Sequence, residues 1–205
     1  AAFGMLKQAN ISGQILLNGT DVSTLSDGDW RQLRGTKISM IFQNPSAYLN
    51  PNRTVENHFK DLFRAHGESY EIARVIDMLK LVHLNDGERI LQSYPFQLSG
   101  GMQQRLAIAL SLILKPSIVF ADEPTSALDM LVQASVLDLM KEVTQALGAT
   151  VIIVTHNIKS AARIANSIGV MNKGQLVEVG STEEVMACPK DEYTRVLLDS
   201  VTKVV

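Results

Sequence analysis

The chain has 205 residues, 46% of them hydrophobic, and a formal net charge of −2. This size suits one domain with a substantial core, and the small net charge gives no electrostatic case for binding nucleic acid or an acidic lipid surface. The single cysteine, Cys188, excludes an internal disulfide and suits a reducing compartment, and no apolar run approaches the roughly 20 residues that span a bilayer.

The first part of the chain combines short apolar runs with turn residues. The pattern predicts, in order, the end of a helix at residues 1–8, a strand at 13–18, a short helix at 26–33 and a buried strand at 37–42. We expect Ser26 or Asp27 to cap the short helix, with Trp30 on its inner side.

The middle of the chain has helical rather than strand periodicity. Apolar spacing predicts helices within residues 54–91 and at residues 99–114, where Pro116 ends the second one. Neither Thr54 nor Ser69 has an acidic residue three positions later, so the sequence shows no capping box at these helix starts.

Strand and helix patterns alternate in the last part of the chain. They predict strands at residues 118–121, 150–154, 167–171 and 175–179, and helices at 129–147, 157–164, 182–186 and 193–198. The β-branched run at 150–154 is typical of a strand covered on both faces. Gly148 is placed like a helix C-cap, and Asn172-Lys173-Gly174 predicts a hairpin turn. This order predicts an α/β fold with a largely parallel sheet and an inserted helical lobe.

Two carboxylates, Asp122 and Glu123, directly follow an apolar strand. Ligands of open α/β sheets bind outside the carboxyl ends of the strands. Hydrolysis of a nucleotide needs one acidic group near Mg²⁺ and another that orients or deprotonates the attacking water. A bare Asp-Glu pair is more often a solvated strand end. The surrounding sequence, Phe-Ala-Asp-Glu-Pro-Thr-Ser-Ala-Leu-Asp, favours the catalytic interpretation.

A second motif, Ser99-Gly100-Gly101, opens one of the predicted helices. Two glycines at a helix start leave backbone amides open to an anion, and the helix dipole favours negative charge there. Ser-Gly-Gly alone is more often an ordinary capped helix. The following Gln-Gln-Arg and the short distance in sequence to Asp122 favour phosphate binding.

Five motifs, in this order along the chain, resemble those of ATP-binding cassette (ABC) ATPases. They are the Q-loop glutamine Gln43, the signature motif at residues 98–105, the Walker B segment at 120–124, the D-loop at 126–129 and the switch histidine His156. The resemblance covers essentially the whole chain. It implies one ABC ATPase domain over residues 1–205 with a P-loop NTPase-type core at 1–43 and 116–205 and a helical signature subdomain at 44–115.

The resemblance also implies a role for each motif residue. Asp122 and Gln43 would hold Mg²⁺, Glu123 would be the general base for water, and His156 would contact the γ-phosphate of ATP. The residues implied to bind the nucleotide of an opposite subunit, or to communicate across that interface, are Ser99, Gly100, Gly101, Gln103 and Asp129. The implied catalytic unit is a head-to-tail dimer of two identical or related cassettes. Without the resemblance, His156 and Gln43 would be taken as structural or surface residues.

A finer resemblance points to the oligopeptide, dipeptide and nickel importers. Residues 44–51 (Asn-Pro-Ser-Ala-Tyr-Leu-Asn-Pro) and 193–198 (Tyr-Thr-Arg-Val-Leu-Leu) are similar to segments of that group, although Asp191-Glu192 replaces its His-Pro. This implies ATP-driven import of peptides or nickel through membrane permeases fed by a substrate-binding protein. The subunit would lie at the cytoplasmic face of the inner membrane, with residues 44–63 toward the permease and no nucleic-acid partner. The alternatives are a soluble, non-transport ABC ATPase and a half-site donor to a complete partner cassette.

No Gly-x-x-x-x-Gly-Lys-Ser/Thr phosphate loop occurs in the sequence. Residues 1–6 resemble the helix that follows this loop in the family. We favour a chain cut just after the loop over a natural subunit that supplies only its signature side. The missing strand is expected beside the strand that ends at Asp122. The 205 residues alone are then expected to aggregate and to hydrolyse ATP negligibly.

Overall fold

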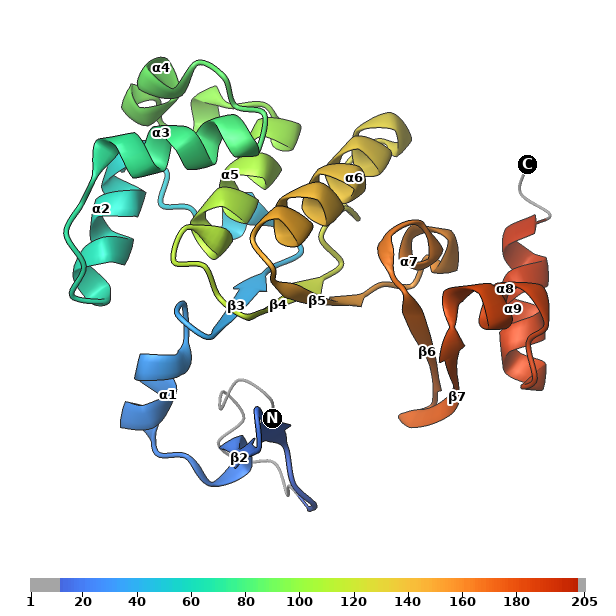
Figure 1. Ribbon diagram of the computed structural model, residues 1–205. Helices are drawn as coiled ribbons and strands as arrows, with labels where there is room; N and C mark the ends of the chain where they lie inside the picture. Colours follow the sequence, from blue (N-terminus) through green and yellow to red (C-terminus); the bar gives the residue numbers. More distant parts are fainter. Residues whose placement is uncertain (1–11, 203–205) are drawn as a thin grey trace.

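The computed structural model describes residues 12–202 (Figure 1), so the helix expected at residues 1–8 lies outside the described residues. Its centre is a parallel sheet whose strands, in spatial order, are β3 (Ile38–Ile41), β4 (Ile118–Asp122) and β5 (Thr150–Val154). Ile38 pairs with Ile118, which in turn pairs with Thr150. The three carboxyl ends therefore meet at one edge of the sheet, as the α/β prediction requires.

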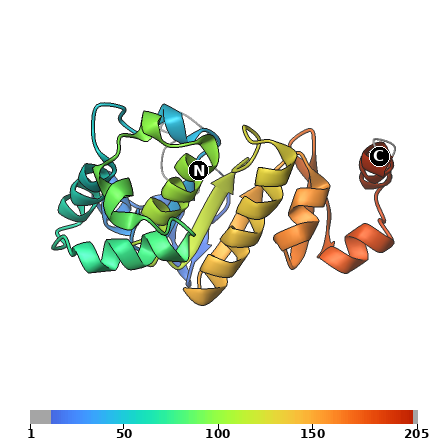
Figure 2. The same cartoon turned by 90° about the horizontal axis from the view of Figure 1, so that it is seen from above.

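One face of this sheet is covered by α5 (Gly100–Leu112) and α6 (Met130–Ala146). Asp129 caps α6, Gly148 follows it with a φ of +67°, and Val136, Met140 and Val143 on its inner face are fully buried. The helices α2 (Val55–Ala65), α3 (Ile72–Leu81) and α4 (Gly87–Gln92) extend the same core beyond α5. Seen from above, α2–α5 gather at one end of the molecule and α6 lies in the middle (Figure 2).

The middle of the chain is helical, as predicted. Among the described residues between β3 and β4 there is no strand, only the four helices and the short 3-10 turns η2 (Pro45–Ala47) and η3 (Pro95–Gln97). Thr54 does cap α2, because its hydroxyl accepts the Asn57 N–H at 3.4 Å, whereas α3 starts after Glu71 without a side-chain cap.

A small N-terminal layer lies against the opposite face of the sheet. It contains β1 (Leu16–Leu17), β2 (Thr20–Asp21), the 3-10 turn η1 (Val22–Thr24) and α1 (Asp27–Leu33). Trp30 of α1 is 3% exposed and clusters with Val22 and Ile38. Ser26 is the N-cap of α1 and forms a capping box with Asp29. The strand predicted at residues 13–18 is only two residues long, because the chain turns back at Asn18-Gly19, which both have positive φ.

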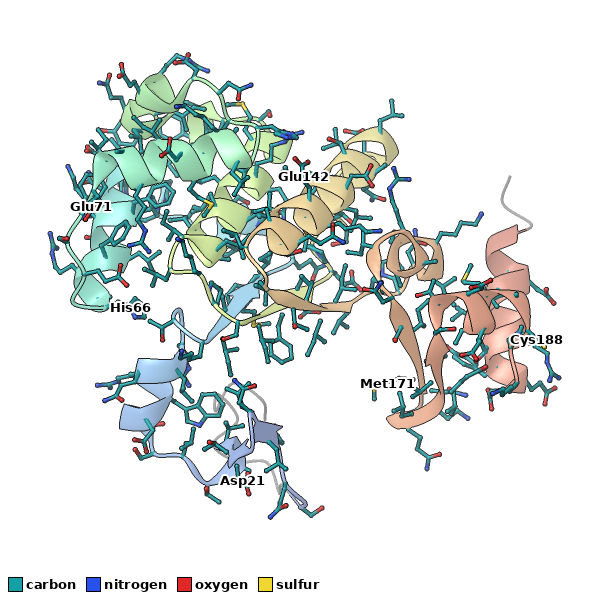
Figure 3. All side chains as sticks on the ribbon, in the orientation of Figure 1. Asp21, His66, Glu71, Glu142, Met171 and Cys188 are labelled. Carbon is teal, nitrogen blue, oxygen red and sulfur yellow. The ribbon has the colours of Figure 1, made fainter. Side chains whose placement is uncertain are left out.

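The C-terminal part forms a separate small core around a hairpin. Its elements are α7 (Ile158–Ile164), β6 (Ser167–Asn172), β7 (Gln175–Ser181), α8 (Thr182–Ala187) and α9 (Glu192–Thr202). The predicted hairpin turn is confirmed, with Lys173 and Gly174 both at positive φ. The exposed Met171 lies near the end of β6, and the exposed Cys188 lies between α8 and α9 (Figure 3).

Two expectations about the sheet are wrong. The β5 strand is not covered on both faces: Ile152 is 43% and Val154 is 57% exposed, because in the described part of the chain only the face toward α6 is packed. A phosphate-loop strand beside the Asp122 strand is also excluded. Both edges of β4 are occupied, one by β3 and the other by β5, so neither is open to a further strand.

Candidate functional site

Glu123 follows β4 with its backbone in the left-handed region, at a φ of +43°. This conformation costs a non-glycine residue roughly 1–2 kcal/mol and must be held by its surroundings. The Glu123 N–H donates to the carbonyl of Val154 at 2.8 Å, and the Ser126 hydroxyl donates to the Glu123 carbonyl at 3.2 Å. The strained turn therefore directs the carboxylate over the carboxyl edge of the sheet.

The Glu123 carboxylate contacts one residue beyond the end of each of the other two strands. His156, just beyond β5, has its Nδ1 atom 2.8 Å from Glu123 Oε1. Gln43, just beyond β3, has its Nε2 atom 3.5 Å from Glu123 Oε2, at the long limit of a hydrogen bond. The structure thus brings together all three residues predicted to be catalytic.

Asp122 ends β4 opposite Val154 and is exposed. Within residues 12–202 its carboxylate makes no hydrogen bond or ion pair, whereas the neighbouring Glu123 carboxylate makes contacts to two side chains. The described residues contain no group of three or more His, Cys, Asp and Glu side chains arranged to hold a metal ion. Asp122 is therefore a single carboxylate at the edge of the site.

The start of α5 is built from backbone amides and small residues. Ser99 is the exposed N-cap, and its hydroxyl accepts the Met102 N–H at 3.3 Å. A Cβ atom on Gly101 would lie 3.1 Å from Val132 of α6, so the close approach of the two helices favours glycine here. Ser99, Gly100 and Gly101 lie together at this helix start, as predicted.

Two of the predicted nucleotide-binding side chains make bonds within the chain. The Nε2 atom of Gln103 donates to the carbonyls of Pro95 and Leu98 at 2.9 and 3.1 Å, which ties the preceding turn to α5. The Asp129 carboxylate accepts the Val132 N–H at 3.0 Å as the cap of α6. Both side chains hold the motif in shape.

Two cavities adjoin these residues. One of about 70 Å³ is lined by Glu123, Thr125, Ser126, Gln133, Thr155, His156, Asn157 and Ser160. The other, of about 230 Å³, is lined by Gln43, Asn44, Pro45, Ser46, Gly100, Gln103, Gln104, Pro124, Ala127 and Leu128. The second cavity therefore connects the Q-loop, signature and D-loop segments.

Sequence reasoning missed the polar residues that shape the surroundings of His156. Asn157 caps α7, since its side-chain oxygen accepts the N–H groups of Lys159 at 3.0 Å and Ser160 at 3.3 Å. An Asn before an apolar helical run is a readable N-cap signal. No comparable signal in the sequence marks Gln133, and Gln104 belongs to the signature motif without a role of its own having been predicted, although the two line the cavities from neighbouring helices.

This fold is that of an ATP-binding cassette. A solved dimeric structure of a post-hydrolysis state of the ATP-binding cassette MJ0796, bound to ADP and Pi, matches 83% of this chain and 74% of its own chain, with a TM-score of 0.70 and 29% identity. The sequence model of the family described as "ABC transporter" matches residues 3–126. The chain belongs to the ABC transporter family, which confirms the resemblance in the motifs.

Curated relatives carry transport names. The chain is 42% identical over 198 residues to the dipeptide transport ATP-binding protein DppD of Caldanaerobacter subterraneus subsp. tengcongensis, covering 95% of this chain and 60% of the relative. It is 39% identical over 196 residues to the oligopeptide transport ATP-binding protein OppD of Lactococcus lactis subsp. cremoris, covering 94% and 58%. The chain thus spans 58–60% of the length of these relatives.

Proposed function

We propose that this chain is part of the ATP-hydrolysing subunit of an ABC importer that moves peptides across a membrane. One observation carries the proposal: Gln43 and His156 both reach the carboxylate of Glu123 at the carboxyl edge of the parallel sheet. A carboxylate in this position, which contacts a histidine through one oxygen and a neutral amide through the other, suits the activation of a water molecule for phosphoryl transfer.

Within this proposal each residue has a separate task. Glu123 accepts the proton of the attacking water through its carboxylate. Its contact with His156 Nδ1 fixes the imidazole ring and leaves Nε2 to contact the γ-phosphate. The amide of Gln43 orients the water or its surroundings beside the second carboxylate oxygen.

The proposal includes Mg²⁺ as the partner of ATP. Asp122 fits this ion, because Mg²⁺ in nucleotide sites takes one or two carboxylates and completes its shell with water and phosphate oxygens. The exposed Asp122 carboxylate has no competing partner within residues 12–202, and Gln43 supplies a further oxygen at the same edge. Bound there, the ion would neutralise charge on the phosphates.

We propose further that two cassettes act head to tail. Ser99, Gly100 and Gly101 then bind the γ-phosphate of the opposite subunit's ATP through the hydroxyl and the amides at the start of α5. Gln103 and Asp129 support this interface by holding the turn before α5 and the start of α6. The dimeric state of the MJ0796 cassette supports this arrangement.

The remaining parts of the proposal concern the transporter. The names of the relatives, which are dipeptide and oligopeptide transport ATP-binding proteins, support peptides as cargo and membrane permease subunits as partners. A substrate-binding protein upstream is a further part of the proposal. No helix in residues 12–202 is both long and apolar enough to cross a bilayer. We place the subunit at the cytoplasmic face of the membrane, bound to the permease, with residues 44–63 toward it.

The test is transport by a purified assembly. The complete gene product is purified with the membrane subunits that accompany it and placed in vesicles with the substrate-binding protein. The proposal predicts that peptide raises the rate of Mg²⁺-dependent phosphate release and that labelled peptide accumulates only with ATP. ATP hydrolysis that never depends on the membrane subunits would point instead to a soluble ABC ATPase.

A further inference from the structure

Helix α5 runs alongside the chain segment that leads from β3 into η2. Near its end, the Ser111 hydroxyl donates to the carbonyl of Met40 in β3 at 3.1 Å. Gln104 lies seven positions earlier, two helical turns away on the same face. It therefore faces the continuation of that segment, and it lines the 230 Å³ cavity together with Gln43–Ser46.

The Gln104 side chain is a buried donor with no acceptor. The residue is 1% exposed, and its Nε2 atom is closed to solvent and makes no hydrogen bond to any residue that the structure describes. The adjacent Gln103 donates from the same atom to two carbonyls. Buried polar groups in native proteins are nearly always paired, so the unpaired Gln104 amide calls for an explanation.

The cavity separates α5 from residues 43–46. Its walls carry no charged side chain, and the polar groups opposite α5 belong to residues 43–46. The Gln43 amide lies 3.5 Å from Glu123, which leaves room for this segment to approach the site and shorten that hydrogen bond. A small shift of residues 43–46 against α5 would fill the cavity and bring a carbonyl to Gln104.

We propose that Gln104 is a positioning residue for Gln43. When the cavity closes, the Gln104 amide donates to a main-chain carbonyl of residues 43–46 and holds Gln43 in place beside Glu123. Gln104 thereby couples the helix that begins at Ser99 to the hydrolysis site of its own chain. This inference rests on the proposed function, because Gln43 acts there during ATP hydrolysis.

The test compares Gln104→Met with Gln103→Met in the complete gene product, since Met keeps the length of Gln and lacks the donor. Without nucleotide, Gln104→Met is expected to raise the melting temperature by about 2–4 °C, because it removes an unpaired donor, whereas Gln103→Met lowers it. In steady-state kinetics Gln104→Met is expected to reduce kcat roughly tenfold while KM for ATP stays within about twofold.

Three results of this comparison would overturn the role proposed for Gln104. A lower melting temperature for Gln104→Met, or failure of both Gln104→Met and Gln104→Leu to fold, would show that the amide is paired in the resting protein and would overturn the inference. An unchanged kcat would overturn it as well. If the wild-type protein hydrolyses no ATP, the proposed function is contradicted instead. The melting temperatures of Gln104→Met and Gln103→Met would still test whether the Gln104 amide is unpaired, because the two shifts are expected to have opposite signs.

Discussion

The imidazole of His156 and the carboxylate of Glu123 lie in contact, with Nδ1 2.8 Å from Oε1, although 33 positions separate them. The main chain reinforces this contact, because the Glu123 N–H donates to the carbonyl of Val154 at 2.8 Å. Side chain and backbone of Glu123 are therefore both tied to the end of β5. The geometry of the site depends on a residue whose own conformation is strained.

Replacing Glu123 by glycine is expected to stabilise the protein. Glycine adopts the φ of +43° without the roughly 1–2 kcal/mol that a side chain costs there. The lost contact with His156 is exposed and worth little. Thermal unfolding should show a rise of a few degrees for Glu123→Gly and none for Glu123→Ala, which loses the same contacts but keeps the strain. Equal behaviour of the two variants would contradict the role assigned to backbone strain.

Asp129 is expected to matter first as a helix cap. Its carboxylate accepts the Val132 N–H at 3.0 Å, so Asp129→Ala should lower the free energy of unfolding by about 1 kcal/mol. Asp129→Asn keeps a good cap and should change it far less. Urea denaturation of the two variants measures the difference. If Asn destabilises as much as Ala, the charge and not the cap is what α6 needs.

The two glycines at the start of α5 are expected to differ. Alanine favours helix by about 1 kcal/mol over glycine. At Gly100 the added Cβ meets only Leu128 at 3.7 Å, while at Gly101 it meets Val132 at 3.1 Å. Gly100→Ala should therefore stabilise the protein more than Gly101→Ala in chemical denaturation. The account of close α5–α6 packing is wrong if both variants gain equally.

Acid sensitivity of the C-terminal part is expected to depend on Glu178. Hydrogen bonds from the backbone N–H of Lys190 at 2.8 Å and of Asp191 at 3.1 Å lower the pKa of this carboxyl below its ordinary value of 4.5. A lowered folded-state pKa gives stability that is present above the unfolded pKa and lost as the pH falls through the folded one.

Glu178→Gln should therefore be less stable than wild type at neutral pH and should lose less stability as the pH falls below about 4.5. The free energy of unfolding, measured at pH 7 and at pH 3 for both proteins, tests the two expectations. Glu183→Gln, an exposed change on α8, is the matched control and should follow the wild-type curve. Parallel curves for Glu178→Gln and wild type would contradict the prediction.

The motifs that resemble those of ABC ATPases supplied the candidate site residues, and the parallel sheet explains why three of them lie close together. Glu123 and His156 follow strands that read clearly as apolar runs, and parallel strands bring their carboxyl ends together. The caps at Ser26 and Ser99 are local signals in the sequence, whereas the capping role of Asp129 was not predicted, although Asp is a common N-cap residue. These features depend on neighbours in sequence or on one general rule of topology.

What the sequence could not predict depends on distant partners. A β-branched run such as that of β5 is compatible with a strand covered on one face or on both. The exposure of Ile152 and Val154 was therefore not predicted. Gln103 and Gln104 are identical in type and adjacent, yet one donates twice and the other has no partner among the described residues. Their difference arises only from the helix face on which each one lies.

The central claim, that Glu123 is the base of an ATPase, is tested most directly by Glu123→Gln in the complete gene product. ATP binding and phosphate release are measured on the same samples with Mg²⁺ present. The account predicts that phosphate release falls by roughly 10²–10⁴-fold while ATP remains bound, because Gln keeps the shape of Glu but cannot accept the proton. Phosphate release at close to the wild-type rate would contradict it.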